Sequence, residues 1–89
     1  MYQFQASSRF KTQFRKLTDK DKEQTRAVIE KLLNNEALER KHKDHALKGE
    51  YQGYRECHIR ADLILIYQKY TDVLILVGIA VGSHSELFG

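Results

Sequence analysis

Two apolar runs in the last third of the chain, separated by only two residues, constrain its fold more than any other feature. The first run covers residues 63–70 and the second covers residues 73–81, with Thr71-Asp72 as a tight break between them. Apolar runs of this length that are bounded by a break are typical of strands. They predict two long strands that form a hairpin, buried on one or both faces and ending at Gly82.

The first third of the chain indicates helices. Residues 2–5 alternate aromatic and polar side chains, as in a short first strand, and Ser7 or Ser8 can cap a helix behind it. The apolar positions of that helix, at four- and three-residue spacing, are Phe10, Phe14 and Leu17. Thr18 and Asp21 resemble a capping box and predict the start of a second helix. The two helices are expected to form a hairpin.

The period changes to two after the polar stretch from Glu36 to Gly49. Residues 54–59 alternate in the manner of a strand, and Cys57 falls among the presumed core positions, where it acts as a small apolar residue. Nothing divides the chain: it contains no repeat, no linker and no proline. The sequence therefore predicts one α+β domain over residues 1–89, with an N-terminal strand and a two-helix hairpin packed on a mainly antiparallel, twisted sheet.

The composition limits what such a domain can do. A chain of 89 residues leaves no room for a separate cofactor domain, so we expect its chemistry to reside on side chains, without a cofactor or a metal ion. A single cysteine cannot form an internal disulfide, and neither an apolar leader nor a long apolar span is present. These features predict a cytoplasmic protein that does not engage a membrane.

Positive charge gathers in the connection between the helical and strand halves. The net charge is +3, and Lys41, Lys43 and Lys48 surround two histidines in this connection. Loops between regular elements often carry function. The basic loop is therefore a candidate contact for a polyanion, with Lys43 and Lys48 as substrate-binding residues.

Three histidines and one aspartate form the candidate chemical site. His45 precedes the strand half, His58 and Asp62 lie four residues apart, and His84 follows the last strand. Histidine titrates near neutral pH, so several imidazoles beside a carboxylate favour acid/base chemistry. RNA cleavage needs a base for the ribose 2′-hydroxyl, an acid for the leaving oxygen and positive charge near the phosphate. A nuclease is therefore the first functional hypothesis.

Other interpretations of these residues remain open. His42 and His45 are three apart, which is compatible with a zinc site, but no second paired cluster accompanies them. A sequence-specific DNA-binding protein is the weakest alternative, because no helix combines basic and amide residues with a helix-turn-helix geometry. Phe88, at the end of the chain, can either seal the core or stack on a base.

Several separate segments resemble one protein family in both order and spacing. They are Asp44-His45-Ala46-Leu47-Lys48-Gly49, Gly53-Tyr54-Arg55-Glu56-Cys57-His58, Asp62, Leu65-Ile66-Tyr67 and Gly82-Ser83-His84-Ser85-Glu86-Leu87-Phe88. This set resembles the YafQ branch of the RelE superfamily of bacterial toxins. The resemblance implies a RelE-like fold and a toxin of a type II toxin–antitoxin system.

The resemblance also implies an activity, a set of partners and a site. The activity is that of a ribosome-dependent endoribonuclease, or mRNA interferase, that inhibits translation and growth. The partners are the 70S ribosome, mRNA and a cognate antitoxin, often of the ribbon-helix-helix type, through which alone DNA is contacted. By position, His45, His58, Asp62 and His84 match the catalytic residues and Phe88 matches a substrate contact. Which histidine is the general base stays open.

The departure from the family pattern with the largest expected effect is at position 80. Ala80 stands where the family usually has an arginine, four residues before the last histidine. An arginine there stabilises the charge that develops on the phosphate, and losing one such group costs about 10²–10³ in rate. Either this toxin is attenuated or another cation substitutes. A second hypothesis follows: a catalytically weak module that binds an antitoxin or the ribosome without efficient cleavage.

Overall fold

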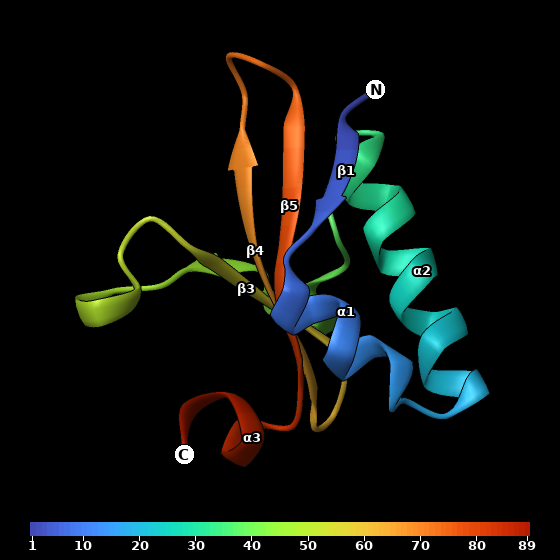
Figure 1. Ribbon diagram of the computed structural model, residues 1–89. Helices are drawn as coiled ribbons and strands as arrows, with labels where there is room; N and C mark the ends of the chain where they lie inside the picture. The colour runs from blue at the N-terminus through green and yellow to red at the C-terminus, as the bar shows by residue number, and fades with distance from the viewer.

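A five-stranded sheet forms the centre of the molecule in the computed structural model, which describes residues 1–89 (Figure 1). The strands are β1 (Gln3–Ala6), β2 (His45–Ala46), β3 (Arg55–Arg60), β4 (Leu63–Tyr70) and β5 (Ile75–Gly82). Their order across the sheet is β1-β5-β4-β3-β2. β1 pairs with β5 in parallel, and all other neighbours are antiparallel. The predicted α+β class and the mainly antiparallel sheet are confirmed.

Three helices and two short 3₁₀ segments complete the chain. They are α1 (Ser8–Arg15), α2 (Asp19–Leu33), α3 (His84–Phe88), and the 3₁₀ turns Arg40–His42 and Gly49–Tyr51. Ser7, rather than Ser8, caps α1, because its hydroxyl accepts the Phe10 amide at 3.0 Å. α1 and α2 lie on one face of the sheet, whereas α3 lies beyond one end of it (Figure 1).

The start of α2 differs in one respect from the sequence prediction. The Thr18 hydroxyl accepts the Asp21 amide at 3.1 Å, as expected of an N-cap. The Asp21 carboxylate does not return to the Thr18 amide, so the capping box is only half formed. Both carboxylate oxygens instead accept hydrogen bonds at 2.8 Å from Arg60, at the end of β3. The residue read as a local cap therefore makes a tertiary contact.

The predicted hairpin is present, but it begins later than the apolar pattern indicates. β4 and β5 pair antiparallel from Tyr70↔Ile75 onward. Val73 and Leu74, predicted to open the second strand, lie in the turn and are exposed. Leu74 has a φ of 56°, which a strand does not accommodate. The short strand β2 and the terminal helix α3 were absent from the expected element order.

Side chains alternate between two apolar clusters on opposite faces of the sheet. The larger cluster joins the helices to one face, and the smaller lies on the other face with Ile64, Ile66, Ala80 and Leu87. Cys57 is fully buried in the larger cluster, and burial raises the pKa of its thiol to about 12, which confirms its apolar role.

An irregularity in β5 decides which residues face the smaller cluster. Ile66 pairs with Ala80 while Tyr67 pairs with Gly78, so Ile79 is an extra residue on β5. A bulge of this kind changes the alternation of side chains along a strand. As a result, Ala80 joins the smaller cluster and Val81 the larger one.

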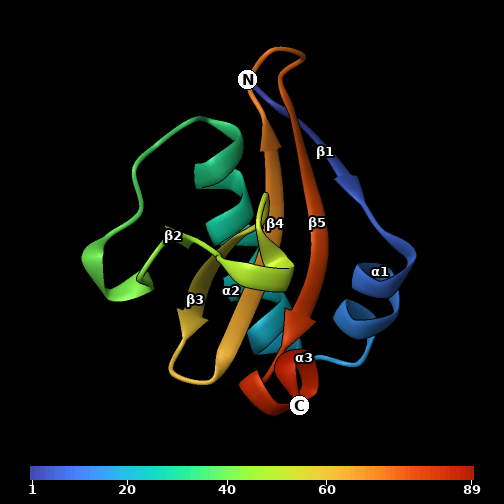
Figure 2. The ribbon, with the colours of Figure 1, turned by 90° about the vertical axis from the view of Figure 1, so that its left-hand side faces the viewer.

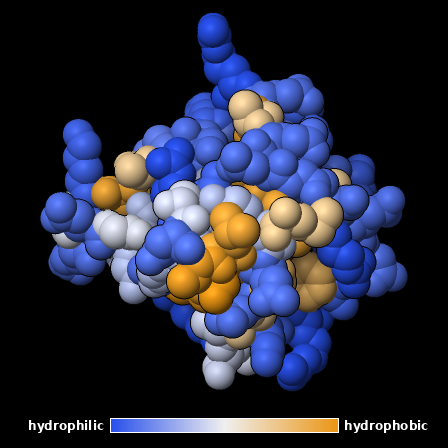
Figure 3. All heavy atoms as spheres, turned by 90° about the horizontal axis from the view of Figure 1, so that it is seen from above, coloured by the Kyte–Doolittle hydropathy of each residue, from blue (hydrophilic) through white to orange (hydrophobic).

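The end of the molecule away from α3 carries an apolar surface. Orange apolar atoms interrupt a mostly hydrophilic surface in the view from above (Figure 3). The large apolar residues that remain exposed in the molecule are Met1, Tyr70, Val73 and Leu74. None of the helices has both the length and the apolar character needed to cross a membrane.

The Asp21–Arg60 pair predicts a specific dependence of stability on pH. Arg60 holds the pKa of the Asp21 carboxyl below its ordinary value of 3.8. Because the pKa of Asp21 is lower in the folded state, the pair stabilises the fold at pH values above the ordinary carboxyl pKa of 3.8. That stabilisation is lost as the pH falls through the lowered folded value. In urea denaturation, the stability difference between the parent chain and Asp21→Asn is expected to shrink below about pH 3.8.

A matched control is available in the same helical turn. Asp19→Asn removes a carboxylate from the first turn of α2 without breaking the contact with Arg60. Its effect on stability is expected to lack the component caused by the ion pair. If the stability difference between the parent chain and Asp21→Asn stays constant from pH 7 to pH 2.5, protonation of Asp21 is not coupled to folding.

Candidate active site

The smaller apolar cluster lies on the face of the sheet opposite α2, and α3 lies at one end of this sheet (Figure 2). Two rows of paired residues cross this face. One row runs from His45 on β2 through Glu56 and Ile66 to Ala80. The next row begins two residues along β3, at His58, and runs through Ile64 to Gly82. Since a strand rises about 3.3 Å per residue, the rows lie about 6.6 Å apart and form one continuous surface.

His45 is the most constrained of the three histidines. Its Nδ1 lies 2.6 Å from the Lys43 carbonyl oxygen, and its Nε2 lies 2.9 Å from Glu56 Oε2. A backbone carbonyl only accepts hydrogen bonds, so Nδ1 donates to Lys43 while Nε2 faces the Glu56 carboxyl group. The His45 side chain is 51% exposed and the Glu56 side chain only 10%. The ring is therefore held from two sides while it remains open to a substrate.

Glu56 is a site residue that the sequence analysis missed. It was read as one position of an alternating strand and as part of a matching segment, but not as a site residue. The signal was present, because Glu56 lies two residues before His58, and such residues share a face of a strand.

His58 is partly buried on β3 and lines a basic hollow of about 470 Å³. Lys41, Lys43 and Arg60 also line this hollow, which lies between α2, the first 3₁₀ turn and the end of β3. The His58 backbone contacts His42 here, because the His58 carbonyl oxygen lies 2.6 Å from His42 Nδ1. An anionic group can enter the hollow from solvent.

Asp62 and His84 are brought together at the end of the sheet. Asp62, in the turn between β3 and β4, accepts the backbone amide of His84 at 3.1 Å. A full capping box starts α3: the Ser83 hydroxyl accepts the Glu86 amide, and the Glu86 carboxylate accepts the Ser83 amide. The hydrogen bond from the Ser83 amide holds the pKa of Glu86 below its ordinary value. The carboxylates of Asp62 and Glu86 therefore fix the segment that presents the exposed His84 ring.

Phe88 continues a row of rings that begins at His84. The two residues are four apart on α3, and their ring centroids are 5.0 Å apart. Phe88 also packs edge-on against Tyr51 at 5.3 Å, and Tyr51 lies 6.4 Å from Tyr54. Phe88 is partly buried against the smaller cluster, so it supports that cluster and retains an accessible ring. Tyr51 was not singled out by the sequence, because nothing local relates it to Phe88.

Ala80 lies beneath this surface and has no exposed area. It packs with Ile64, Ile66 and Leu87. At the position for which the resemblance implied an arginine, this chain thus has a buried methyl group.

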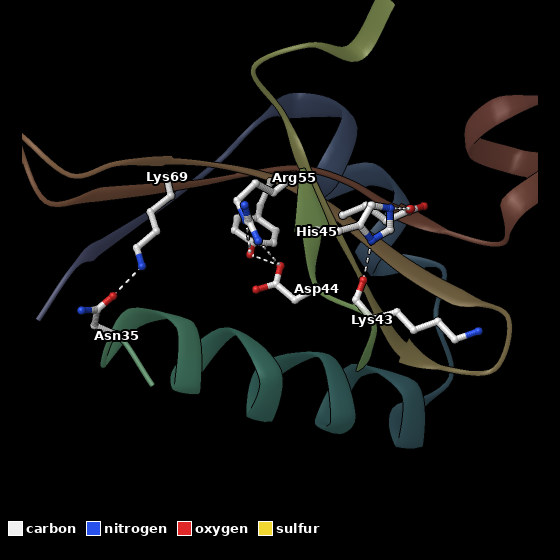
Figure 4. A network of polar contacts seen from close by, with 8 residues as sticks. Asn35, Lys43, Asp44, His45, Arg55 and Lys69 are labelled. Atoms are coloured by element: carbon white, nitrogen blue, oxygen red, sulfur yellow. Dashed lines mark hydrogen bonds and ion pairs between the residues drawn. The ribbon is translucent and has the colours of Figure 1, made fainter. Parts of the chain in front are cut away.

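The two lysines predicted to bind substrate flank β2. Lys43 and Lys48 are exposed, and neither forms an ion pair. The Lys43 side chain extends away from the His45 ring (Figure 4).

His42 takes no part in a shared site with His45. Its buried ring lies with Nδ1 2.6 Å from the His58 carbonyl oxygen, a different partner from those of His45. No three His, Cys, Asp or Glu side chains are grouped so as to hold a metal ion. The zinc hypothesis therefore has no structural support from this pair.

Comparison with known proteins places these features in context. The family model described as the bacterial toxin of type II toxin–antitoxin systems, YafQ, matches residues 2–89. A toxin described as YafQ from Haemophilus influenzae is 56% identical over 41 residues, which is 46% of this chain and 40% of that protein. The mRNA interferase toxin YafQ of Escherichia coli K12 is 41% identical over 79% of this chain and 75% of that protein.

Solved structures agree with the sequence comparison. The structural alignment with the crystal structure of YafQ from E. coli strain BL21(DE3) covers 100% of this chain and 100% of that one, with a TM-score of 0.88 and 27% identity. YafQ in the E. coli DinJ–YafQ toxin–antitoxin complex has a TM-score of 0.85 and 28% identity, over 99% of this chain and 98% of that one. The sheet and helices described above are therefore those of known YafQ structures.

Proposed function

The chain belongs to the YafQ family of type II toxin–antitoxin toxins, and from this premise we propose that it is an endoribonuclease that cleaves mRNA on the ribosome. Two of its relatives carry the name mRNA interferase. The observation that best supports the proposal is the arrangement of three imidazoles and two carboxylates on and beside one sheet face. Cleavage inhibits translation and growth.

The chemistry follows from two groups of side chains on either side of a shared surface. His45 and His58 lie on β2 and β3, and His84 lies with Asp62 at the end of the sheet. One imidazole accepts the proton of the ribose 2′-hydroxyl, and another gives a proton to the leaving oxygen. Asp62 holds the backbone that carries His84, so the carboxylate acts by orientation.

Substrate contacts surround these groups. Lys43 and Lys48 are exposed and provide positive charge for phosphates. Phe88 offers a ring face to a base, and base–aromatic stacking is worth about 1–3 kcal/mol. The RNA is therefore expected to cross the surface between β2 and α3.

The ribosome supplies orientation in this proposal. The 2′-hydroxyl, phosphorus and leaving oxygen must align for attack, and flexible RNA seldom adopts that geometry. Binding in a fixed geometry can supply several orders of magnitude in rate.

An antitoxin is the expected regulatory partner. The structure of a relative, E. coli YafQ, is known in complex with its antitoxin DinJ. We expect a cognate antitoxin with a ribbon-helix-helix end that contacts DNA to bind this chain and suppress cleavage.

A second candidate function rests on Ala80. Because the usual cation is replaced by a buried methyl group, the chain can bind ribosome or antitoxin and cleave poorly. This weak binding module retains the same partners and differs only in rate.

Ribosome dependence can be tested with two forms of one message. Purified protein is mixed with a translated mRNA on 70S ribosomes and with the same mRNA alone. Primer extension is expected to show cleavage about 10²-fold faster on the ribosome, because of orientation. A message without a ribosome-binding sequence, in the presence of ribosomes, is the control. Equal rates on all three substrates exclude a role of the ribosome.

A further inference from the structure

A polar network on the helix-facing side of the sheet holds the residue that precedes His45 (Figure 4). The Tyr67 hydroxyl donates to Asp44 Oδ1 at 2.5 Å. Arg55 Nη2 lies 3.3 Å from the same oxygen, and Arg55 Nε donates to the Tyr67 hydroxyl at 3.2 Å. Each of the three side chains thus contacts the other two.

The network occupies the opposite face from the candidate active site. Tyr67 belongs to the larger apolar cluster, whereas its neighbour Ile66 belongs to the smaller one beneath the site. Asp44 and His45 are adjacent, but Asp44 contacts Tyr67 of the larger cluster. His45 instead contacts Glu56, which pairs with Ile66 of the smaller cluster. A contact on one side of the sheet can therefore fix a ring on the other.

The chemical state of the network is fixed as well. Tyr67 is 1% exposed, and burial raises its pKa above the ordinary value. The hydrogen bond to Tyr67 raises the pKa of Arg55. The phenol therefore remains a donor and the guanidinium remains charged over the whole physiological range.

The backbone at His45 needs such an anchor. β2 has only two residues, and Lys43, two positions before its first residue, has a φ of 48°, a conformation that non-glycine residues rarely adopt. The carbonyl oxygen of Lys43 accepts a hydrogen bond from His45 Nδ1 at 2.6 Å. An unfavourable backbone conformation persists only where surrounding contacts hold it in place. The adjacent residue Asp44 has such contacts, with Tyr67 and Arg55.

We propose that Tyr67 is a positioning residue for His45, acting through Asp44 across the sheet. Tyr67 and Arg55 hold the Asp44 carboxylate, which fixes the Lys43–Asp44 backbone and, through the Lys43 carbonyl, the orientation of the imidazole. The catalytic part of this inference rests on the proposed ribonuclease function. The structural part does not depend on it.

Tyr67→Phe removes only the hydroxyl and leaves the buried ring in place. We expect kcat for cleavage of ribosome-bound message to fall about tenfold to a hundredfold, with KM unchanged, because a misplaced group slows the chemical step. Tyr70→Phe is the matched control: it removes a hydroxyl from the same strand, where the partner is Gln68. It is expected to leave kcat unchanged.

Nuclear magnetic resonance separates positioning from a general loss of structure. In Tyr67→Phe, the ring signals of His45 are expected to shift and broaden, while those of His84, on α3, stay as in the parent. Asp44→Asn keeps an acceptor oxygen but loses the charge, and a smaller effect in the same direction is expected.

Two outcomes overturn the proposal. One is a Tyr67→Phe variant with unchanged His45 signals. The other is an equal change at His45 and His84, which indicates a general structural effect. If the parent cleaves no message, the proposed function fails, and the ring signals still decide whether Tyr67 orients His45.

Discussion

Replacing His84 by alanine is expected to lower the rate of mRNA cleavage by about 10²–10⁴, the range of a lost general acid or base. His84 is exposed at the start of α3, so its removal leaves no cavity in the core. The capping box of Ser83 and Glu86 and the bond from the residue 84 amide to Asp62 do not depend on the imidazole. Single-turnover cleavage of ribosome-bound message measures the loss.

The neighbouring residue provides the control for this experiment. Ser85→Ala changes another exposed side chain on α3 and is expected to cleave at the parent rate. Thermal unfolding and binding of the cognate antitoxin should be preserved in both variants. If His84→Ala cleaves as fast as Ser85→Ala, the assignment of His84 to the chemistry is wrong.

Introducing arginine at position 80 is expected to raise cleavage by about 10²–10³, the value of one electrostatic contact to the developing phosphate charge. Residue 80 lies in the same row as His45 and Glu56, and the next row ends at Gly82, close to His84. A guanidinium that extends from this row can reach the phosphate between the imidazoles. Its stem can lie along the apolar floor while the charged end remains in water.

The same substitution has a structural cost that the experiment must separate from catalysis. Ala80 is fully buried beside Ile66 and Leu87, and overpacking a core typically costs about 1–3 kcal/mol. Ala80→Met adds similar length without charge, so it measures this cost alone. Faster cleavage in Ala80→Arg, but not in Ala80→Met, supports an attenuated nuclease. If a folded Ala80→Arg variant gains no activity, arginine at position 80 is not the missing element.

Local signals made most of the architecture predictable. The apolar runs predicted the β4–β5 hairpin, and side-chain oxygens at Ser7 and Thr18 marked the starts of α1 and α2. These signals depend on residues close together in the sequence, so they can be read without a fold. The end of β5 at Gly82 was also correct, because the apolar run stops there.

Matching motifs found candidate residues for the site, but not their arrangement. The sequence identified His45, His58, Asp62 and His84 as one candidate group. It could not show that Asp62 binds the backbone of His84 rather than its ring. That distinction depends on where two chain segments meet, which a motif does not encode.

The sequence by itself determined the types of the long strands and of α1 and α2, the places where those two helices begin and the chemical identity of the candidate groups, because each depends on local composition and spacing. The tertiary structure alone decided which groups share a surface. The bulge at Ile79 turned Ala80 toward the site, and strand register joined His45 to Glu56. The anchor of Asp44 on Tyr67 likewise spans 23 positions of sequence. Such contacts depend on register and bulges, and a shift of one residue reverses the face of every side chain that follows.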